Sequence, residues 1–581
     1  MTVYNKLVAR AFQRIAALLQ IRGDDAFKIR AYGRAAETLR HWPEDIRVVW
    51  RAGRLTDLPH IGPALAKKVD ELLRTGRLAY LERLEAEVPP GLLELLELPG
   101  LGPSRVRALW QQLGLTSTAD LHAALVAGRV RGIRGLGPRT LQRLQQALEA
   151  RSPDAAAPLR LDAAWGLART LAARLLDHAA VVRAAPTGAV RRWAALVPQV
   201  RVLAAAATPP PADALADDPL VRAVQVVDPH TWAVATALDC TVQVHWTRPE
   251  TWGAAWLATT GPDAHWAALQ AHAAARGLRL TPAGLYDAGG RPLPATSEAQ
   301  VYAALDLPWI PPCAREWALP LDDAQAWARA LAARLPWDVP RRAELHAHTT
   351  WSDGHLDVRA LARAALDRGL RVLAITDHSV SLKVAGGLSA DDLARQRAEI
   401  QAVQADLGSG LRLLQGAEVD ILPDGRLDYP DEVLAQLDVV IASPHQALEQ
   451  DPAQATARLL RAVQHPRVHI LGHPTGRLLP RRAGLAPDMA QIVRAAAEHG
   501  VALEINANPH RLDLRAEHAR LAVQAGAWLS IDTDAHRAAE LDYWPYGLAV
   551  ARQAGAEAAQ VLNTWAPERL LQHLARKRGT A

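Results

Sequence analysis

The sequence has only two cysteines, Cys240 and Cys313, among 581 residues. Two thiols cannot form a disulfide framework or a cysteine-rich zinc module, and they suit a reducing cytosol. No apolar run reaches the roughly 18 residues that a membrane-spanning helix needs. Charged residues interrupt the segment from Met1 to Arg22, unlike the apolar core of a signal peptide. We therefore expect a cytoplasmic protein of several domains that makes no contact with a membrane.

The positive charge is concentrated near the N-terminus. The whole chain has 66 Lys or Arg and 61 Asp or Glu, a net charge of +5. Residues 1–150 contain 23 Lys or Arg and 15 Asp or Glu, whereas the remainder is slightly acidic. A basic N-terminal region suits binding to the phosphate backbone of nucleic acid, although ordinary solvated helix faces would give the same count.

The chain divides into three regions with different patterns. Residues 1–150 alternate helical patterns with breaks that contain Gly and Pro, which predicts an all-α region. Residues 159–316 are rich in Ala and Trp and mix strand-like with helical runs, which predicts an α+β region. From residue 343 onward short apolar strands alternate with helices, as in a parallel α/β sheet or barrel. We expect linkers at residues 152–158 and 317–341.

Three turns in the helical region resemble one another, at residues 58–63, 98–103 and 133–138. A glycine lets the backbone turn there, and the helix that follows offers its free N–H groups to an anion. One such turn would be a plain helical hairpin, but three in a basic region favour contact with DNA phosphates. The candidate DNA-binding residues are Gly62, Lys67, Lys68, Gly100, Gly102, Arg105, Gly135, Gly137 and Arg139.

Histidines and carboxylates follow the apolar strands of the C-terminal region. They are His346, His348, Asp353, Asp377, His378, Glu418, His445, His473, Asp532, Asp534 and His536. A single histidine at a strand end is usually a satisfied core residue, but this repeated placement matches where a barrel puts its chemistry. Imidazoles mixed with carboxylates suit Zn²⁺, Mn²⁺ or Fe²⁺ better than Ca²⁺ or Mg²⁺. Two or three such metals together would clamp a phosphate ester, which predicts phosphoester hydrolysis.

This order of ligand-type residues resembles the PHP (polymerase and histidinol phosphatase) metallohydrolase domain. The whole chain resembles bacterial family X DNA polymerases that carry a C-terminal PHP domain. The segment from Ala26 to Tyr32 with the first hairpin is similar to the family's 8-kDa domain, and the other hairpins are similar to its fingers. Residues 187–192 and 307–316 resemble remnants of palm and thumb; the PHP motifs are at residues 418–425, 473–477 and 506–509. The implied domains are a helical DNA-binding domain at 1–85, fingers at 86–150, a degenerate palm and thumb at 159–316, the linker at 317–341, and the PHP domain at 342–581.

The resemblance implies a distorted (β/α)₇ barrel with three metal positions, filled by two or three Mn²⁺ or Zn²⁺ ions, with Fe²⁺ as a third option. The implied ligands are His346, His348, Glu418 and Asp534 for the first metal, Glu418, His445 and His473 for the second, and Asp353, His378 and His536 for the third. The implied activity is a 3′–5′ exonuclease, with 3′-phosphatase and abasic-site endonuclease as further activities. Arg477 or Arg481 would hold substrate phosphate, unless they are surface salt-bridge partners.

The sequence departs from the family in the palm. Polymerisation needs three palm carboxylates to hold two Mg²⁺ ions, and the matching positions here are Gln199, Arg201 and Gln243. We therefore predict that the chain does not polymerise DNA, unless nearby Asp217, Asp218 or Asp228 replaces the missing carboxylates. In the 8-kDa region Lys68 matches the family's lyase nucleophile, although a lysine there would also serve as a phosphate contact.

These observations leave several functions to compare. The expected partner is DNA with gaps or 3′ ends, bound by a monomer. The alternatives are a small-molecule phosphatase of the histidinol-phosphatase kind, a DNA-binding scaffold with a structural metal, and a gap-filling polymerase that is still active.

Overall fold

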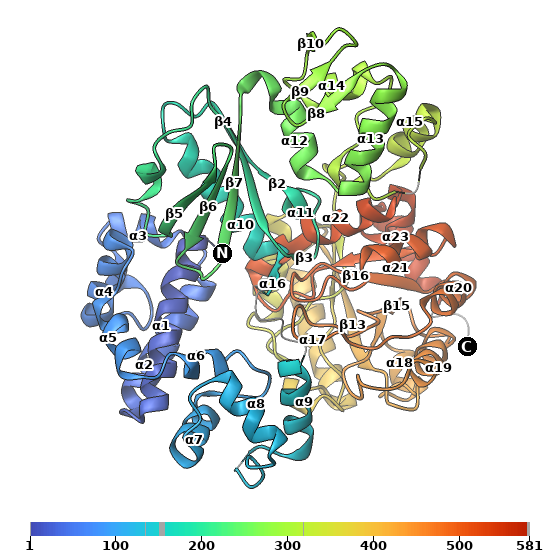
Figure 1. Ribbon diagram of the computed structural model, residues 1–581. Helices are drawn as coiled ribbons and strands as arrows, with labels where there is room; N and C mark the ends of the chain where they lie inside the picture. The colour runs from blue at the N-terminus through green and yellow to red at the C-terminus, as the bar shows by residue number, and fades with distance from the viewer. Residues whose placement is uncertain (1, 134, 150–156, 318, 578–581) are drawn as a thin grey trace. The chain divides into compact units, whose positions relative to one another are not determined.

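The computed structural model describes residues 2–133, 135–149, 157–317 and 319–577 (Figure 1). The Arg139 side chain and most of the expected linker at 152–158 lie outside the described residues. None of the described helices is both long and apolar enough to span a bilayer. The chain forms two compact units, one from Met1–Pro158, Ala163–Thr187 and Pro198–Pro249, the other from Leu159–Asp162, Gly188–Val197 and Glu250–Ala581.

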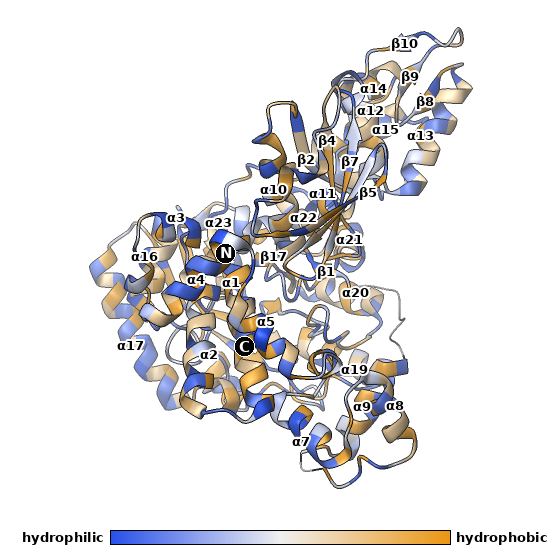
Figure 2. Ribbon diagram, turned by 60° about the vertical axis from the view of Figure 1, so that its left-hand side comes forward, coloured by the Kyte–Doolittle hydropathy of each residue, from blue (hydrophilic) through white to orange (hydrophobic). Residues whose placement is uncertain are grey.

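The N-terminal region is all-α, as predicted. Its described helices are α1 Val3–Arg22, α2 Ala26–His41, α3 Ile46–Arg51, α4 Pro63–Thr75, α5 Ala79–Glu87, α6 Gly91–Leu95, α7 Pro103–Leu113, α8 Thr118–Val126 and α9 Pro138–Glu149. The Thr2 side chain caps the start of α1, and Gly23 in the left-handed conformation ends it. Its Leu7, Phe12 and Ile15 are buried. The other helices also mix hydrophobic and hydrophilic residues along their length, as amphipathic helices do (Figure 2).

The same unit contains an open five-stranded sheet in the described part of the chain. The strand order is β2-β4-β7-β6-β5, and the β4–β7 pair is parallel. The bounds are β2 Arg183–Thr187, β4 Val200–Ala205, β5 Val221–Asp228, β6 Thr231–Thr236 and β7 Thr241–Thr247, with α10 at Leu161–Leu176. Strands and helices alternate in this region, so the α+β prediction holds here.

Small helices and short strands begin the second unit. They are β1 Leu159–Arg160, α11 Gly188–Arg191, β3 Leu196–Val197, α12 Trp252–Thr260, α13 Asp263–Ala275, β8 Arg279–Thr281, β9 Gly284–Tyr286, β10 Pro292–Leu293, α14 Glu298–Ala304 and α15 Ala324–Ala333. Helix α15 lies inside the segment expected to be a linker. Its Trp327 is buried and stacks on Trp317 at 6.1 Å between ring centroids, so this segment packs on the preceding helices.

The C-terminal region is a parallel barrel. In the described residues seven strands pair in chain order, β11 Ala343–Glu344, β12 Val372–Ile375, β13 Arg412–Asp420, β14 Val439–Ser443, β15 Ile470–Leu471, β16 Ala502–Asn506 and β17 Leu529–Asp532. A bridge between Ala347 and Ala535 joins the chain just after β11 to the chain just after β17, so the sheet nearly closes. Almost every strand residue is buried, which explains the apolar runs that predicted these strands.

Helices lie outside these strands (Figure 1). They are α16 Val358–Asp367, α17 Ala390–Leu407, α18 Asp431–Leu434, α19 Pro452–Val463, α20 Met489–His499, α21 Ala516–Gln524, α22 Trp544–Ala554 and α23 Pro567–Arg576. The barrel that the resemblance implied is therefore confirmed, and its strands all end on the same side.

Candidate metal centre

Nine of the side chains singled out in the sequence lie together where the barrel strands end. His346 and His348 follow β11, and Glu418 lies near the end of β13. The others are His378 after β12, His445 after β14, His473 after β15, Asp534 and His536 after β17, and Asp353 in the loop after His348. Because parallel strands end at one edge, residues far apart in the sequence meet there.

Glu418 is at the centre of this cluster, and its side chain is buried. Five imidazole nitrogens face its two oxygens: His378 Nδ1 at 2.9 Å, His346 Nε2 at 3.4 Å and His348 Nε2 at 3.6 Å from Oε2, and His473 Nε2 at 2.7 Å and His445 Nε2 at 3.2 Å from Oε1. A carboxylate whose two oxygens face different groups of imidazoles has the arrangement of a bridging metal ligand.

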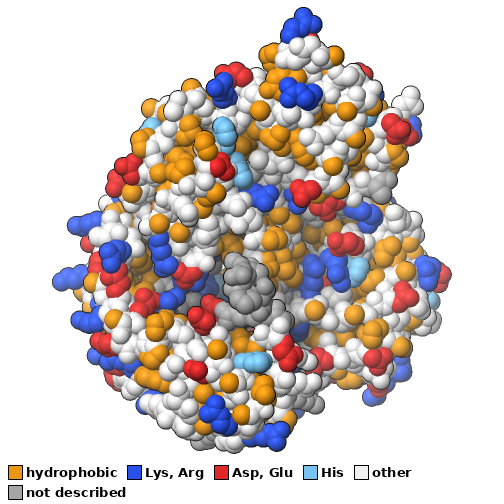
Figure 3. All heavy atoms as spheres, viewed as in Figure 1, with side chains coloured by type: hydrophobic (Ala, Val, Ile, Leu, Met, Phe, Trp, Pro, Cys, Tyr) orange, Lys and Arg blue, Asp and Glu red, His pale blue; other side chains and the backbone are white. Residues whose placement is uncertain are grey.

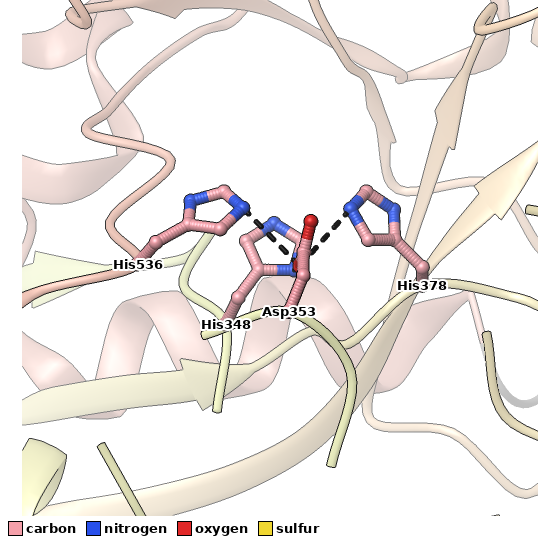
Figure 4. A group of neighbouring side chains, drawn as sticks. All are labelled: His348, Asp353, His378 and His536. Atoms are coloured by element: carbon pink, nitrogen blue, oxygen red, sulfur yellow. Dashed lines mark ion pairs between the residues drawn. The ribbon is translucent and has the colours of Figure 1, made fainter. Parts of the chain in front are cut away.

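Asp353 is the second focus, nearer to solvent. His378 Nε2 and His536 Nε2 point toward its Oδ1 from either side, at 3.5 and 3.3 Å (Figure 4). His348 Nδ1 lies 3.9 Å from the same oxygen, and His348 Nε2 lies 3.1 Å from Asp534 Oδ1. The Asp353 side chain is 38% exposed, so a substrate can reach this side of the cluster.

The ligand atoms fall into three overlapping groups. These are His348, Asp353, His378 and His536; His346, His348 and Asp534; and His378, Glu418 and His445. His348 and His378 each belong to two groups, whereas the resemblance implied one metal for each. The overlap means that the three positions are immediate neighbours.

Two aspartates from the sequence pattern do not join the cluster. Asp377 accepts hydrogen bonds from the Thr349 hydroxyl at 2.7 Å and from Gln396 Nε2 at 2.7 Å. Asp532 accepts from the Leu345 N–H at 2.9 Å. Both carboxylates therefore fix loops and strands around the site.

Buried carboxylates that the sequence analysis did not single out orient the histidines. Glu504 Oε1 is 2.6 Å from His346 Nδ1, and Asp420 Oδ1 is 2.9 Å from His445 Nδ1. Each can accept the Nδ1 proton of its histidine, and the opposite Nε2, which faces Glu418, is then the nitrogen available to a metal. The signal in the sequence was a charged residue inside an apolar strand, which must find a partner when buried.

The charges of the cluster fit a divalent cation. Burial lowers the pKa of His348 to about 3, assisted by His536 and His378, so this ring is neutral at pH 7. Burial also lowers the pKa of His378, but Glu418 and Asp353 outweigh it and bring the pKa to about 10. The negative charge of the buried Glu418 carboxylate and of the Asp353 carboxylate thus favours a positive charge between them, and a divalent cation would supply it.

The hydrogen bonding also fits a metal. Nε2 of His346 and of His445, both ring nitrogens of His348 and His473, and both oxygens of Glu418 make no hydrogen bond with any described residue. Buried polar atoms without a partner are rare in proteins, and metal coordination would satisfy them. Imidazole nitrogen with carboxylate oxygen suits Mn²⁺, Zn²⁺ or Fe²⁺.

The arginine beside the cluster is not one that the sequence analysis named. Arg477 donates through Nε to the Arg511 carbonyl at 2.7 Å and through its terminal nitrogen to the Leu512 carbonyl, so its guanidinium supports that backbone. Arg481 is exposed in the turn at residues 478–482. The guanidinium that reaches the cluster is that of Arg511, whose Nε donates to Asp534 Oδ2 at 3.2 Å. The phosphate role of Arg477 or Arg481 stays a prediction.

The three predicted hairpins are present, and each precedes a helix. The left-handed backbone position of each turn is His60 (φ 64°), Gly100 (φ 82°) or Gly135 (φ 88°). In the second hairpin Arg105 donates to the Gly100 carbonyl and so stabilises the turn. The residue with positive φ is thus the third of each six-residue turn. Two of the three turns have glycine at this position, and the first turn has His60 instead.

The second glycine of each hairpin leaves the helix end open. A methyl group placed on Gly62, Gly102 or Gly137 would meet no atom within 4 Å. Gly62 and Gly102 are the N-caps of α4 and α7, with φ of −77° and −93°. The free N–H groups at these helix starts are therefore accessible to an anion.

Basic side chains accompany the hairpins. Lys67 is exposed, and Lys68 Nζ lies 5.1 Å from the centroid of the Tyr80 ring. Lys and Arg side chains gather along the edge formed by α3, α4 and α5, mixed with acidic ones (Figure 3). The lyase role of Lys68 stays a prediction.

The palm positions hold no carboxylate. Arg201 in β4 is the register partner of Gln243 in β7, and Arg201 Nε donates to Gln243 Oε1 at 3.2 Å. Gln199 donates to the Thr241 carbonyl at 2.8 Å. Among the described residues, the groups that could hold a metal all lie between residues 346 and 536.

The nearby aspartates have other partners. Asp218 is buried, and its Oδ2 accepts a hydrogen bond from the Tyr4 hydroxyl at 2.7 Å. The same oxygen forms an ion pair with Arg174 Nε at 2.6 Å. Asp228 accepts from the His230 N–H at 2.7 Å and so closes the turn after β5. Neither is beside Arg201 in the sheet register.

Four regions of the sequence match known families. Residues 3–78 match the helix-hairpin-helix domain, 92–150 the SAM-like helix-hairpin-helix tandem, 255–316 the DNA polymerase beta thumb, and 344–508 the PHP domain. These matches account for the hairpins and for the barrel that carries the histidine cluster.

Curated relatives cover either nearly the whole chain or about two fifths of it. The "Probable phosphatase" proteins of Thermoanaerobacter sp. (strain X514) and Edwardsiella ictaluri (strain 93-146) are 28% and 31% identical over 38% and 40% of this chain, and 89% and 94% of their own length. "DNA polymerase/3′-5′ exonuclease PolX" of Bacillus subtilis (strain 168) is 34% identical over 568 residues, 97% of each chain. Because this likeness runs through hairpins, thumb and barrel alike, the chain belongs to the family X DNA polymerases that carry a C-terminal PHP domain.

Proposed function

We propose that this chain is a DNA-repair enzyme that hydrolyses phosphodiester bonds at 3′ ends, as a Mn²⁺-dependent 3′–5′ exonuclease. The observation that carries the proposal is the convergence of nine His, Asp and Glu side chains around Glu418 and Asp353. Removal of a 3′-phosphate and incision at an abasic site would use the same centre, because each breaks a P–O bond at a DNA end or lesion.

The cluster residues would hold two or three divalent ions, Mn²⁺ or Zn²⁺. A bound divalent ion supplies positive charge beside a phosphate ester and promotes ionisation of water at neutral pH. Glu504 and Asp420 keep His346 and His445 in the tautomers that a metal ligand requires. Arg511 is placed to neutralise a phosphate oxygen that reaches the cluster.

The N-terminal region would hold the DNA. The open helix starts at Gly62, Gly102 and Gly137 can each receive one backbone phosphate, and exposed Lys67 adds positive charge. Contacts of this kind do not read sequence, so the protein would select DNA by structure, such as a gap or a recessed 3′ end.

We also infer that the palm does not polymerise. Nucleotidyl transfer needs carboxylates that hold Mg²⁺ ions around the incoming nucleotide. Gln199 and Gln243 are neutral, and the charge of Arg201 would repel a dication. The palm would therefore serve as a scaffold or as a platform for DNA.

The decisive experiment incubates the full chain with Mn²⁺ and end-labelled DNA that has a one-nucleotide gap or a recessed 3′ end. We expect stepwise release of 3′ nucleotides by the wild type and loss of this activity in His346→Ala. The control variant His230→Ala changes an exposed histidine in a β-turn and should keep the wild-type activity. Parallel reactions with all four dNTPs should show no extension of the primer. Absence of nucleotide release at every Mn²⁺ concentration would refute the nuclease proposal, and primer extension would refute the inactive palm.

The relatives that cover about two fifths of the chain are named probable phosphatases and favour a second candidate, a small-molecule phosphatase. Histidinol phosphate and nucleoside monophosphates are the substrates to compare under the same conditions. A higher kcat/KM on these than on DNA would favour this candidate, and the hairpins would then serve another purpose.

A further inference from the structure

The loop at residues 379–388 follows His378 directly and exposes two valines. Val384 is 101% exposed and Val380 is 42% exposed. Among the described residues from 343 onward, Leu521 at 36% is the only other large hydrophobic side chain in this class. Lys383, next to Val384, is also exposed. Both valines belong to one loop that begins at a residue of the cluster, which makes them candidates for contact with a substrate.

The base of this loop is fixed to the cluster. The Ser379 N–H donates to the Glu418 carbonyl at 3.0 Å, and the Leu388 N–H donates to the His378 carbonyl at 2.8 Å. The two sides of the loop are so close that a Cβ on Gly387 would lie 1.9 Å from the Ser379 carbonyl oxygen. Only glycine fits there, so the loop has a narrow neck that begins at a cluster residue.

The middle of the loop is also tied to the cluster. The Ser381 hydroxyl donates to Asp420 Oδ2 at 2.9 Å, and Asp420 also holds His445. The 3-10 turn Lys383–Ala385 follows, and this turn presents Val384 to solvent. The structure therefore places an apolar tip, formed by Val380 and Val384, on a loop whose base and middle are hydrogen-bonded to residues of the site.

We propose that the tip contacts the nucleobase of the 3′-terminal nucleotide whose phosphodiester bond is cut, so that the site recognises the terminal nucleoside as well as its phosphate. The inference rests on the proposed exonuclease function and names the residues that would read this substrate. Val380 is two residues from His378, within roughly 7 Å along the chain. A nucleoside attached to a phosphate at the cluster extends far enough to reach it, whereas a bare phosphate does not.

The chemistry of the tip fits this occupant. The face of a nucleobase is apolar and packs on aliphatic side chains, and the adjacent phosphate attracts Lys383. Two valines offer far less area than a stable protein–protein interface buries, so a folded protein partner is a poor match.

The test uses full-length protein with Mn²⁺ and two DNA duplexes that differ only in the 3′-terminal residue, thymidine or base-less tetrahydrofuran. We expect wild type to release the thymidine about tenfold better in kcat/KM, from burial of apolar surface against the base. The Val380→Ser/Val384→Ser variant should lose this preference and keep the wild-type rate on the base-less end. Leu521→Ser, an exposed apolar residue on α21, is the matched control and should retain the preference.

The possible results separate the two proposals. A variant that keeps the full preference for thymidine would overturn the base contact. A variant that is slower on both ends by the same factor would also overturn it, because the valines would then act on something other than the base. If wild type releases neither terminal residue, the exonuclease function itself is wrong and the inference falls with it.

Discussion

Replacement of Glu504 by glutamine tests whether the cluster is a metal centre without touching any proposed ligand. The Glu504 carboxylate accepts two hydrogen bonds of 2.6 Å, one from His346 Nδ1 and one from the His473 N–H. A glutamine has one oxygen for these two donors, and its NH₂ group would face the other. If the NH₂ group faces His346 Nδ1, the ring proton must move to Nε2, the atom that should bind the metal.

The expected size of the effect follows from the lost hydrogen bond. A hydrogen bond to a charged group contributes about 1.5–3 kcal/mol, and about 1.4 kcal/mol corresponds to a factor of ten in an equilibrium constant. We therefore expect Glu504→Gln to weaken Mn²⁺ binding about 10- to 100-fold, as is typical when the partner that orients a ligand is removed. The rate at saturating Mn²⁺ should recover most of its wild-type value, because every ligand remains.

Calorimetric titration with Mn²⁺ and the dependence of nuclease rate on Mn²⁺ concentration measure this effect independently. Glu399→Gln is the matched control, since Glu399 accepts one hydrogen bond from Trp351 Nε1 at 2.7 Å and belongs to none of the ligand groups. It should bind Mn²⁺ like wild type. Wild-type affinity in Glu504→Gln, with the fold intact by circular dichroism, would show that His346 needs no orientation and would contradict the assignment of its Nε2 as a ligand.

Three further predictions address other parts of the chain. Gly102→Ala should lower DNA affinity about fivefold by blocking one phosphate contact. It should lower the melting temperature only slightly, because alanine is a poorer N-cap than glycine but its methyl group meets no atom within 4 Å. Gly289→Ala, where the atom nearest to the added methyl group is Asp287 Oδ1 at 3.4 Å, should leave DNA affinity unchanged; fluorescence anisotropy and thermal melts measure both. Glu298 is buried at the start of α14. Burial raises the pKa of its carboxyl group, but Arg315 and Arg191 outweigh this effect and bring the pKa to about 2. The ionised Glu298 therefore stabilises the fold fully above about pH 4.5, and this contribution, about 3 kcal/mol, is lost as the pH falls toward 2. The free energy of unfolding measured against pH should show this loss in the wild type and not in Glu298→Gln. Arg511→Gln should raise KM for DNA about tenfold, because Arg511 reaches the cluster. Arg477→Gln should mainly lower the free energy of unfolding, by about 2 kcal/mol, because Arg477 bonds backbone carbonyls. If Arg477→Gln raised KM and Arg511→Gln only lowered stability, the roles assigned to the two arginines would be wrong.

The barrel and its cluster could be predicted because both follow from the positions of strand ends. Apolar runs such as Val372–Ile375 mark buried strands, and the polar residue that follows each run must lie at one edge of a parallel sheet. His348, Glu418 and His536 are far apart in the sequence, yet this rule alone brings them together. Chemistry that depends on strand ends is therefore visible in the pattern of the sequence.

Residues in loops do not obey such a rule. Arg477 and Arg511 both lie in irregular segments after strands, and only the tertiary contacts decide that one supports a backbone and the other reaches Asp534. The sequence predicts a linker at 317–341, whereas the structure has helix α15 there. The burial of Trp327 depends on the helices before it, which the local sequence does not specify.

Arg201 and Gln243, at the palm positions where the family has carboxylates, lie side by side in the sheet. The sequence identified Arg201 and Gln243 as replacements only through resemblance. The structure makes them register partners on adjacent parallel strands, joined by a hydrogen bond of 3.2 Å, so they occupy one small area of the sheet. An amide beside a guanidinium has the polarity that suits a phosphate, opposite to the carboxylate pair that would attract Mg²⁺. A surface of this kind can still bind the backbone of DNA without catalysing its extension, which is compatible with a chain whose hydrolytic centre lies entirely in the barrel.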